Sequence, residues 1–366
     1  MSLQCGIVGL PNVGKSSLFN ALSNAGAEAA NFPFCTIDPN VGIVPVPDAR
    51  LDRLAELVKP PKVTPTSIEF VDIAGLVKGA SEGKGKGNAF LSHIRLVDLI
   101  IHVVRCFEDD DVVHVEGNID PVRDIGTIDT ELLFKDLETL ERREERVKKM
   151  AKSGDKTLIN QLHMLAGLRN HIEKGKSVRS YKDWDPSHPA FSELFMLTAK
   201  KVLYLCNVDE SDLPDGEGNP HVMAVRNHAR EEDAECVVAC AKIEAEIAEL
   251  NDEEKREFLD SMGLRESGLN RLISAAYREL GLITFFTVGP KEARAWTIRQ
   301  GTKAPQAAGI IHTDFERGFI RAETISFQDF DRLGSEAAAR EAGKMRSEGR
   351  GYTVKDGDII LFRFNV

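Results

Sequence analysis

Long apolar runs are missing from this sequence of 366 residues. No stretch approaches the run of about eighteen apolar residues that a membrane-spanning helix needs. The first residues, MSLQCGIVGL, carry no basic leader before an apolar run. The six cysteines form no CxxC pair and have no histidine at ligand spacing, which argues against a zinc site or a disulfide framework. We therefore expect a cytoplasmic protein with reduced cysteines and no membrane partner.

A positive overall charge is also missing, since the formal net charge is −11. The excess acid lies in residues 1–130, with 11 basic and 17 acidic groups, and in residues 181–280, with 11 and 22. Residues 131–180 carry 12 basic and 8 acidic groups, and residues 281–366 carry 13 and 11. Nonspecific binding of the whole chain to nucleic acid is therefore disfavoured. Only residues 131–180 and 281–366 have the net positive charge that such binding needs.

A phosphate-binding loop is present near the start, in QCGIVGLPNVGKSSLFNALSNA. An apolar strand leads through Gly9-x-x-x-x-Gly14-Lys15-Ser16 into a helix with an apolar face. Backbone amides and the helix N-terminus cradle phosphate oxygens in such a loop, while Lys15 reaches the β and γ phosphates and Ser16 holds Mg²⁺. The expected nucleotide-binding residues of the loop are Asn12, Val13, Gly14, Lys15, Ser16 and Ser17.

Two further elements support a nucleoside triphosphate site. SIEFVDIAGL ends an apolar strand with Asp72-x-x-Gly75, where the acid can face Mg²⁺ and the glycine amide can contact the γ phosphate. Between this strand and the loop, NFPFCTIDPN offers Thr36 as a metal-binding hydroxyl of a switch loop. The alternative for Thr36 is a solvated loop hydroxyl.

The base-reading corner has an altered sequence. GTPases read guanine with Asn-Lys-x-Asp, whereas KVLYLCNVDE offers Asn207, Val208 and Glu210 at those positions. The longer glutamate should misplace the bidentate contact to guanine, and a misfit polar group costs on the order of 1–3 kcal/mol. We therefore expect adenine, with Asn207 at its edge and Val208 on its face, beside a flanking loop at 240–242. The alternative is that Asp209 takes over as the guanine acceptor.

The group that activates water is not obvious. Leu76 stands where many GTPases place a glutamine, so hydrolysis needs another side chain. His93, His102 and His114 are candidates. A core position explains His102 better than catalysis does, and the residues alone favour a structural role for a single histidine over a catalytic one.

These motifs together resemble the Obg-like ATPases of the YchF type. The resemblance covers nearly the whole chain and rests on GIVGLPNVGKSSLFNAL, NFPFCTIDPN, FVDIAGLVKGAS, HVVRCFED, NVDE and EARAWTIRQGTKAPQAAGIIHTDFERGFIRAETI. It implies an ATPase that prefers ATP to GTP, uses Mg²⁺, binds the ribosome in the region of its large subunit, and regulates translation or stress responses. It also assigns hydrolysis to His114 beside Lys15, suggests K⁺ near Asn12, and fits a monomer. Cys240 departs from the serine that is common there.

The order of the motifs predicts an α/β fold with several parts. Residues 1–130 and 181–280 should form a doubly wound P-loop NTPase domain. Residues 131–180 predict an inserted helical hairpin with a break at Ser153-Gly154-Asp155, and its basic balance fits either RNA binding or a solvated face. Residues 281–366 show short strands, and the resemblance identifies them as a TGS domain, a ubiquitin-like β-grasp fold found in proteins that meet RNA; a protein-packing module is the alternative.

Two other functions remain open on the sequence. A conventional GTPase would follow if Asp209 reads guanine. A nonhydrolytic module, in which nucleotide only fixes a conformation for RNA or protein binding, would follow if Leu76 leaves hydrolysis negligible.

Overall fold

The fold consists of two compact units. A computed structural model describes residues 3–28, 40–73, 86–109, 111–115, 117–153 and 155–365. The first unit comprises residues 1–43 and 69–272, and the second comprises residues 44–68 and 273–366. Thr36, Gly75 and Leu76 lie outside the described residues.

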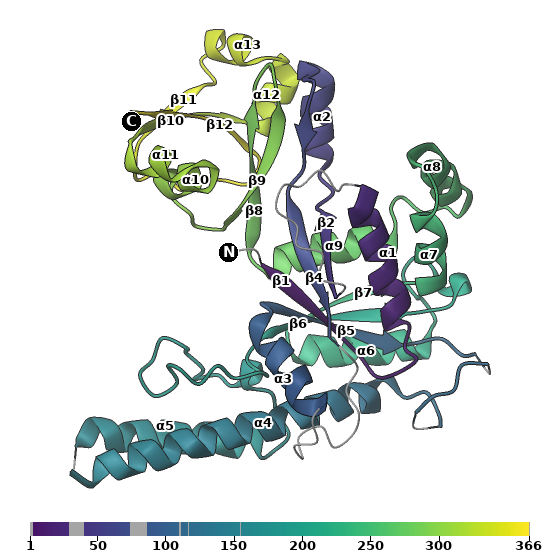
Figure 1. The fold of residues 1–366 in the computed structure, drawn as a ribbon, viewed down its shortest axis with the longest axis vertical. Helices are drawn as coiled ribbons and strands as arrows, with labels where there is room; N and C mark the ends of the chain where they lie inside the picture. Colours follow the sequence, from purple (N-terminus) through teal and green to yellow (C-terminus); the bar gives the residue numbers. More distant parts are fainter. Residues whose placement is uncertain are drawn as a thin grey trace. The chain divides into compact units, whose positions relative to one another are not determined.

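The first unit is built on a six-stranded sheet with the order β2-β4-β1-β5-β6-β7 (Figure 1). Its strands are β1 (Gln4–Val8), β2 (Val41–Pro45), β4 (Ser67–Asp72), β5 (Leu99–Arg105), β6 (Lys201–Asn207) and β7 (Glu235–Ala239). All pairings from β4 to β7 are parallel. Every residue of β5 is buried, as expected of a central strand in a parallel sheet. The predicted P-loop NTPase sheet is confirmed.

The connecting helices of this unit follow their strands along the chain. They are α1 (Lys15–Glu28), α3 (Lys86–Leu96), α6 (Pro220–Glu231), α7 (Ala241–Ala248), α8 (Asp252–Ser261) and α9 (Gly268–Glu279), the last of which crosses into the second unit. The carboxyl ends of the parallel strands lead into the loops that carry the nucleotide motifs, which is where ligands bind in such sheets. No described helix is long and apolar enough to cross a bilayer.

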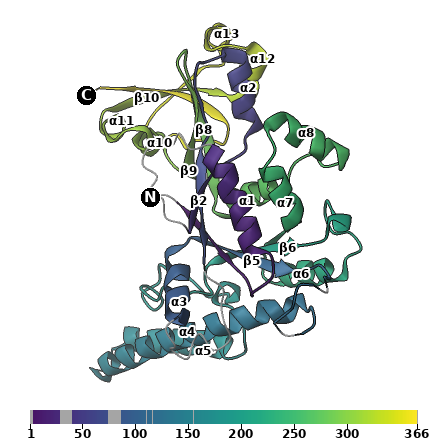
Figure 2. The same cartoon turned by 45° about the vertical axis from the view of Figure 1, so that its right-hand side comes forward.

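A helical hairpin interrupts the first unit, as predicted, but it begins earlier than residue 131. It is formed by α4 (Pro121–Met150) and α5 (Lys156–Ile172), which lie side by side in Figures 1 and 2. The earlier start follows from Asp120, which caps α4 by accepting from the Arg123 N–H, and from Pro121 in the first turn. Asp155 caps α5 in the same way.

The hairpin packs on the segment that follows it. Leu140, Val147, Leu165, Leu168 and Ile172 share a buried cluster with Val178, Phe191, Leu194 and Met196. Asp136 fixes the register, because its carboxylate accepts from the backbone N–H groups of Leu197 (2.7 Å) and Thr198 (2.8 Å). Residues 178–198 therefore belong to the platform on which the hairpin rests.

The second unit contains a mixed sheet with the order β11-β10-β12-β8-β9-β3. Its strands are β3 (Val63–Thr64), β8 (Leu282–Val288), β9 (Ala293–Arg299), β10 (Phe319–Ser326), β11 (Arg346–Glu348) and β12 (Asp358–Phe364). β12 pairs with β8 in parallel, whereas β8–β9, β10–β12 and β10–β11 are antiparallel. A central parallel pair flanked by two hairpins is the β-grasp arrangement, with α10 (Ala304–Ile311) packed on the sheet core. The predicted β-grasp fold is confirmed.

The structure divides the chain differently from the predicted bounds, because residues 44–68 belong to the second unit. Helix α2 (Ala49–Val58) buries Leu51 and Leu54 in a cluster with Phe286 and Phe330. Strand β3 extends the second sheet by pairing with β9. Arg50 also bonds Asp356 at 2.7 Å. The remaining helices of this unit are α11 (Thr313–Arg317), α12 (Phe327–Leu333) and α13 (Glu336–Glu341).

Candidate nucleotide-binding site

The phosphate-binding loop turns sharply between β1 and α1. Asn12 and Gly14 have positive φ values of 63° and 91°, which bend the backbone at the helix start. A Cβ on Gly14 would lie 2.1 Å from the Asn207 amide nitrogen, so only glycine fits. Val13 is 1% exposed, so its side chain anchors the loop in the hydrophobic core. The loop therefore has the shape that turns backbone amides toward a phosphate.

Lys15 and Asp72 form an ion pair through Lys15 Nζ and Asp72 Oδ1. The parallel register of β1 and β4, with Ile7 opposite Asp72, brings the two ends together. Their side chains are 11% and 21% exposed, so the pair is sheltered yet reachable. Ser16 and Ser17 are exposed in the first turn of α1. An ammonium group, a carboxylate and two hydroxyls thus meet at one helix N-terminus.

Asn12 joins the loop to the segment before α4. Its Nδ2 donates to the Val113 carbonyl at 3.1 Å, across 101 residues of sequence. Asn12 is exposed to solvent. The contact brings the backbone next to His114 to the phosphate-binding loop.

Asn207 braces the site instead of standing free at a base edge. Its Nδ2 donates to the Val13 carbonyl (2.9 Å), and its Oδ1 accepts from the Ala241 N–H (2.9 Å). The residue is 3% exposed. One amide hydrogen remains for a ligand. The main task of Asn207 in this structure is to tie the phosphate-binding loop to the start of α7.

Val208 does not offer a face to a ring, so that prediction is wrong. The residue is 2% exposed, and its N–H donates to the Ala239 carbonyl at 3.0 Å. The β6–β7 ladder continues one residue beyond Asn207, which directs the Val208 side chain into the core. Val208 therefore does not cover the base in the way that the lysine of Asn-Lys-x-Asp does in GTPases.

The two acids after Val208 differ in their partners. Asp209 Oδ1 accepts from the backbone N–H (3.1 Å) and the hydroxyl (2.8 Å) of Ser211, and these bonds lower the pKa of Asp209. Glu210 is exposed at the start of the short helix η4 (Glu210–Asp212). A cavity of about 390 Å³ adjoins this corner, lined in part by Asp209 and Ser211. Cys240 precedes α7 without capping it through its side chain.

His114 is buried against the first turn of α4. Its Nε2 lies 2.8 Å from Asp124 Oδ2, and both side chains are 4% exposed. Asp124 Oδ1 also accepts from Arg123 Nη2 at 3.2 Å. The ring is therefore directed into a polar pair, and its edge is not exposed to the phosphate-binding loop.

The other two candidate histidines differ in burial. His102 is 3% exposed on β5, and burial, with Arg179 adding to it, lowers its pKa to about 3. This confirms a core position. His93 is exposed on α3. The five described cysteines are free, and four of them are buried.

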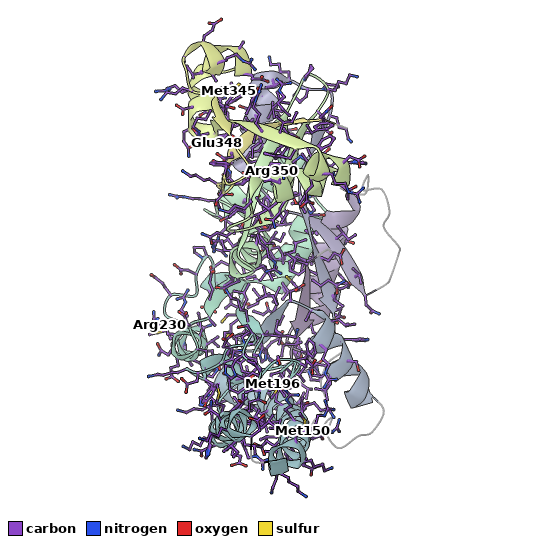
Figure 3. All side chains as sticks on the ribbon, turned by 90° about the vertical axis from the view of Figure 1, so that its left-hand side faces the viewer. Met150, Met196, Arg230, Met345, Glu348 and Arg350 are labelled. Carbon is purple, nitrogen blue, oxygen red and sulfur yellow. The ribbon has the colours of Figure 1, made fainter. Side chains whose placement is uncertain are left out.

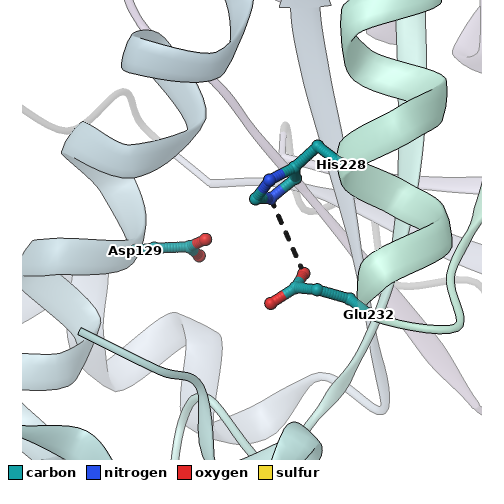
Figure 4. A group of neighbouring side chains, drawn as sticks. All are labelled: Asp129, His228 and Glu232. Atoms are coloured by element: carbon teal, nitrogen blue, oxygen red, sulfur yellow. Dashed lines mark ion pairs between the residues drawn. The ribbon is translucent and has the colours of Figure 1, made fainter. Parts of the chain in front are cut away.

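A second polar cluster lies away from the phosphate-binding loop, and sequence reasoning missed it. Asp129, His228 and Glu232 have the geometry of a possible metal site among the described residues (Figure 4). A cation is already supplied by Arg179, whose Nη2 lies 2.9 Å from Glu232 and 3.7 Å from Asp129. Glu232 also accepts from the Tyr204 hydroxyl at 2.8 Å. The donor set is therefore already occupied by the chain and does not fit a resident metal.

Protonation in this cluster follows from burial and from Arg179. Burial raises the pKa of Asp129 to about 6, against the opposing charge of Arg179. Burial alone would raise the pKa of Glu232, but Arg179 and the hydrogen bonds from Tyr204 and Ser177 outweigh it and lower that pKa. The cluster joins α4, α6 and β6 at the base of the hairpin. No local sequence pattern marks it, because its members are spread over about a hundred residues of the chain.

Comparisons with known proteins agree with this geometry. A family described as 50S ribosome-binding GTPase matches residues 4–159, and a C-terminal family of YchF GTPases, described as a protein of unknown function (DUF933), matches residues 282–365. The "Ribosome-binding ATPase YchF" of Bacillus subtilis is 56% identical over the full length of both chains. The chain belongs to the YchF-type family of Obg-like ATPases.

Other YchF-type proteins are similar over the same span. "Obg-like ATPase 1" of Gallus gallus is 47% identical and is covered to 93%. A solved structure of the Schizosaccharomyces pombe YchF GTPase superposes with a TM-score of 0.88 at 38% identity, covering 99% of this chain and 98% of that one. A GTP-binding protein of Pyrococcus horikoshii, at 18% identity and a TM-score of 0.58, shares the fold.

Proposed function

We propose that this protein is an ATP-hydrolysing switch that associates with the ribosome and regulates translation or stress responses. The observation that carries the proposal is the Lys15–Asp72 pair at the start of α1, within a loop braced by Asn207. The full-length relatives named ribosome-binding ATPases support both the activity and the partner.

The donor set suits a Mg²⁺-bound triphosphate. Lys15 and the backbone of residues 12–17 would hold the phosphates, and Ser16 with Asp72 offers the hard oxygen donors that Mg²⁺ prefers. When bound, the ion would neutralise charge on the phosphates. Without nucleotide, Lys15 and Asp72 neutralise one another in an ion pair. When a triphosphate binds, Lys15 must leave Asp72 to reach a phosphate. Thr36 and Gly75 are proposed to complete the site from the switch segments.

The preference for adenine rests on what the corner lacks. A buried Val208 leaves the ring without a lysine stem, and an exposed Glu210 stands where GTPases have aspartate. Asp209 is the remaining acid for guanine, but one of its oxygens is engaged by Ser211. A conventional GTPase is thus the weaker candidate, although the fission-yeast neighbour is described as a GTPase.

We propose His114 as the residue that acts in hydrolysis, through a change in its position. The Asn12–Val113 contact holds the neighbouring backbone at the phosphate-binding loop, so a local rearrangement suffices to release the ring from Asp124. A free imidazole can orient water near neutral pH. K⁺ near Asn12 is part of the same proposal.

The remaining parts of the proposal concern partners. The protein would act as a monomer in the cytoplasm and meet ribosomal RNA near the large subunit through the hairpin and the TGS domain. The description of the matched family as binding the 50S particle supports this site.

Turnover measurements test the proposal. We expect ATP hydrolysis by the wild type that increases with ribosomes and K⁺, and a loss of at least about tenfold in His114→Ala, the lower range for a positioned acid–base group. His93→Ala, an exposed histidine of the same unit, is the matched control and should keep wild-type turnover. Equal and negligible turnover in every condition would support the nonhydrolytic module, and faster GTP turnover would support the GTPase.

A further inference from the structure

A cationic pocket lies where the hairpin meets its platform, away from the phosphate-binding loop. It has a volume of about 360 Å³ and is lined by Arg95, Arg142, Arg143, Arg146, Glu193 and Phe195, among others. All of these residues belong to the first unit. Four guanidinium groups around one acid make the pocket strongly electropositive in a chain whose net charge is −11.

The positive charge comes from one stripe of α4. Residues 142, 143 and 146 share a helical face with Thr139, at spacings of three, four and seven. Among the described residues, the acidic partner of Arg142 is Glu138, at 3.6 Å. Within the described part of the chain, neither Arg95 nor Arg146 has an acidic partner within 4.0 Å. Arg143 Nη2 donates to the Pro189 carbonyl at 2.9 Å, which fixes the wall of the pocket.

Phe195 is exposed for a reason that lies in the backbone. Glu193 and Phe195 have positive φ values of 68° and 47°, a conformation that costs non-glycine residues free energy. This turn buries Leu194 and Met196, each 3% exposed, and leaves Phe195 79% exposed. The backbone conformation of this turn therefore directs the ring of Phe195 to solvent, beside the arginines of the pocket.

We propose that this pocket binds an unpaired nucleotide of a structured RNA. The base stacks on Phe195, and Arg95, Arg142 and Arg146 neutralise the flanking phosphates. An aromatic platform beside arginines is how proteins hold single-stranded RNA, because every base has a face that can stack. The volume is at the lower end of the range of ~300–1,000 Å³ for ligand pockets, which suits one nucleotide and not a duplex.

The inference deepens the proposed ribosome association, on which it rests, by naming the contact. An acidic peptide is the other ligand that arginines could bind. RNA is favoured because a nucleotide can stack its base on the exposed ring of Phe195 while its phosphates pair with the guanidinium groups. A carboxylate-rich peptide would pair with the guanidinium groups but would leave the ring without a contact.

Binding of a short fluorescein-labelled single-stranded RNA to the full-length protein, followed by anisotropy, tests the proposal. Phe195→Ala should weaken binding about tenfold or more, the range found when a stacking residue is removed. The Arg142→Ala/Arg146→Ala variant should weaken it similarly and lower the slope of log affinity against log salt by about two. ATP affinity should stay at the wild-type value in both.

Matched controls come from the same unit. Phe134→Ala removes an aromatic ring that is 53% exposed on α4 but lies outside the pocket. Arg230→Ala removes an exposed arginine of α6, labelled in Figure 3. Both controls should bind RNA within about twofold of the wild type, a change expected of surface positions away from a contact.

The outcomes separate this inference from the proposed function. Wild-type affinity in both pocket variants, no RNA binding by the wild type, or tighter binding of poly-glutamate than of RNA would each overturn it. Pelleting with ribosomes is measured in parallel. A wild type that fails to pellet contradicts the proposed ribosome association, whereas equal pelleting of the wild type and both pocket variants contradicts the pocket alone.

Discussion

Replacing Asn207 with alanine should disconnect the phosphate-binding loop from the rest of the sheet. The substitution leaves the Val13 carbonyl and the Ala241 N–H without the partners they have at 2.9 Å in the buried interior. A buried polar group without a partner costs about 1–3 kcal/mol, so two of them predict a loss of about 2–6 kcal/mol in the free energy of unfolding. ATP affinity should fall as well, because the loop loses its brace.

The two tryptophans make this measurable, since Trp184 lies in the first unit and Trp296 in the second. In a Trp296→Phe background, fluorescence during urea unfolding reports the first unit, and calorimetry gives the ATP affinity. Asn227→Ala, an exposed amide on α6, is the control and should stay within about 0.5 kcal/mol of its background. An Asn207→Ala variant that matches this control in both measurements would refute the brace.

Three further predictions concern other parts of the first unit. Gly14→Ala should weaken ATP binding at least about tenfold in calorimetry, because its Cβ would meet the Asn207 amide at 2.1 Å; unchanged affinity would contradict this. Asp136→Ala should lower the free energy of unfolding by about 2–6 kcal/mol in urea unfolding followed by Trp184 fluorescence, since two buried N–H groups of the 197–198 backbone lose their acceptor. A loss below about 0.5 kcal/mol would show that the platform holds without Asp136. His102 has a pKa of about 3 when folded against about 6.5 when unfolded, so acid favours the unfolded state as the pH falls through 6.5. In His102→Phe the free energy of unfolding should therefore fall less between pH 7 and 5, and parallel profiles for variant and wild type would disprove the assignment.

Local patterns predicted the elements of this chain well. The spacing of Gly14, Lys15 and the apolar residues after them identifies the strand, loop and helix. The hairpin was predicted to begin at residue 131, although Asp120 and Pro121 mark the earlier start of α4 in the sequence. Such features depend on neighbours along the chain, which a sequence displays directly. The short strands after residue 281 gave the β-rich unit in the same way.

Contacts between elements that are distant in sequence were harder to predict. Helix α2 has an apolar face that fits either unit, and only the packed structure reveals that Leu51 and Leu54 lie in a cluster with Phe286. The direction of Val208 depends on how far the β6–β7 ladder continues. The pairing of His114 with Asp124 joins two positions whose side chains meet only after α4 has formed.

Calorimetric titration of Mg²⁺-bound ATP into the wild type and Lys15→Ala tests the central claim most directly. Charge-assisted hydrogen bonds contribute about 1.5–3 kcal/mol, so the loss of the ammonium group should weaken ATP binding at least about tenfold. Equal ATP affinity in the two proteins would contradict a triphosphate site at the start of α1.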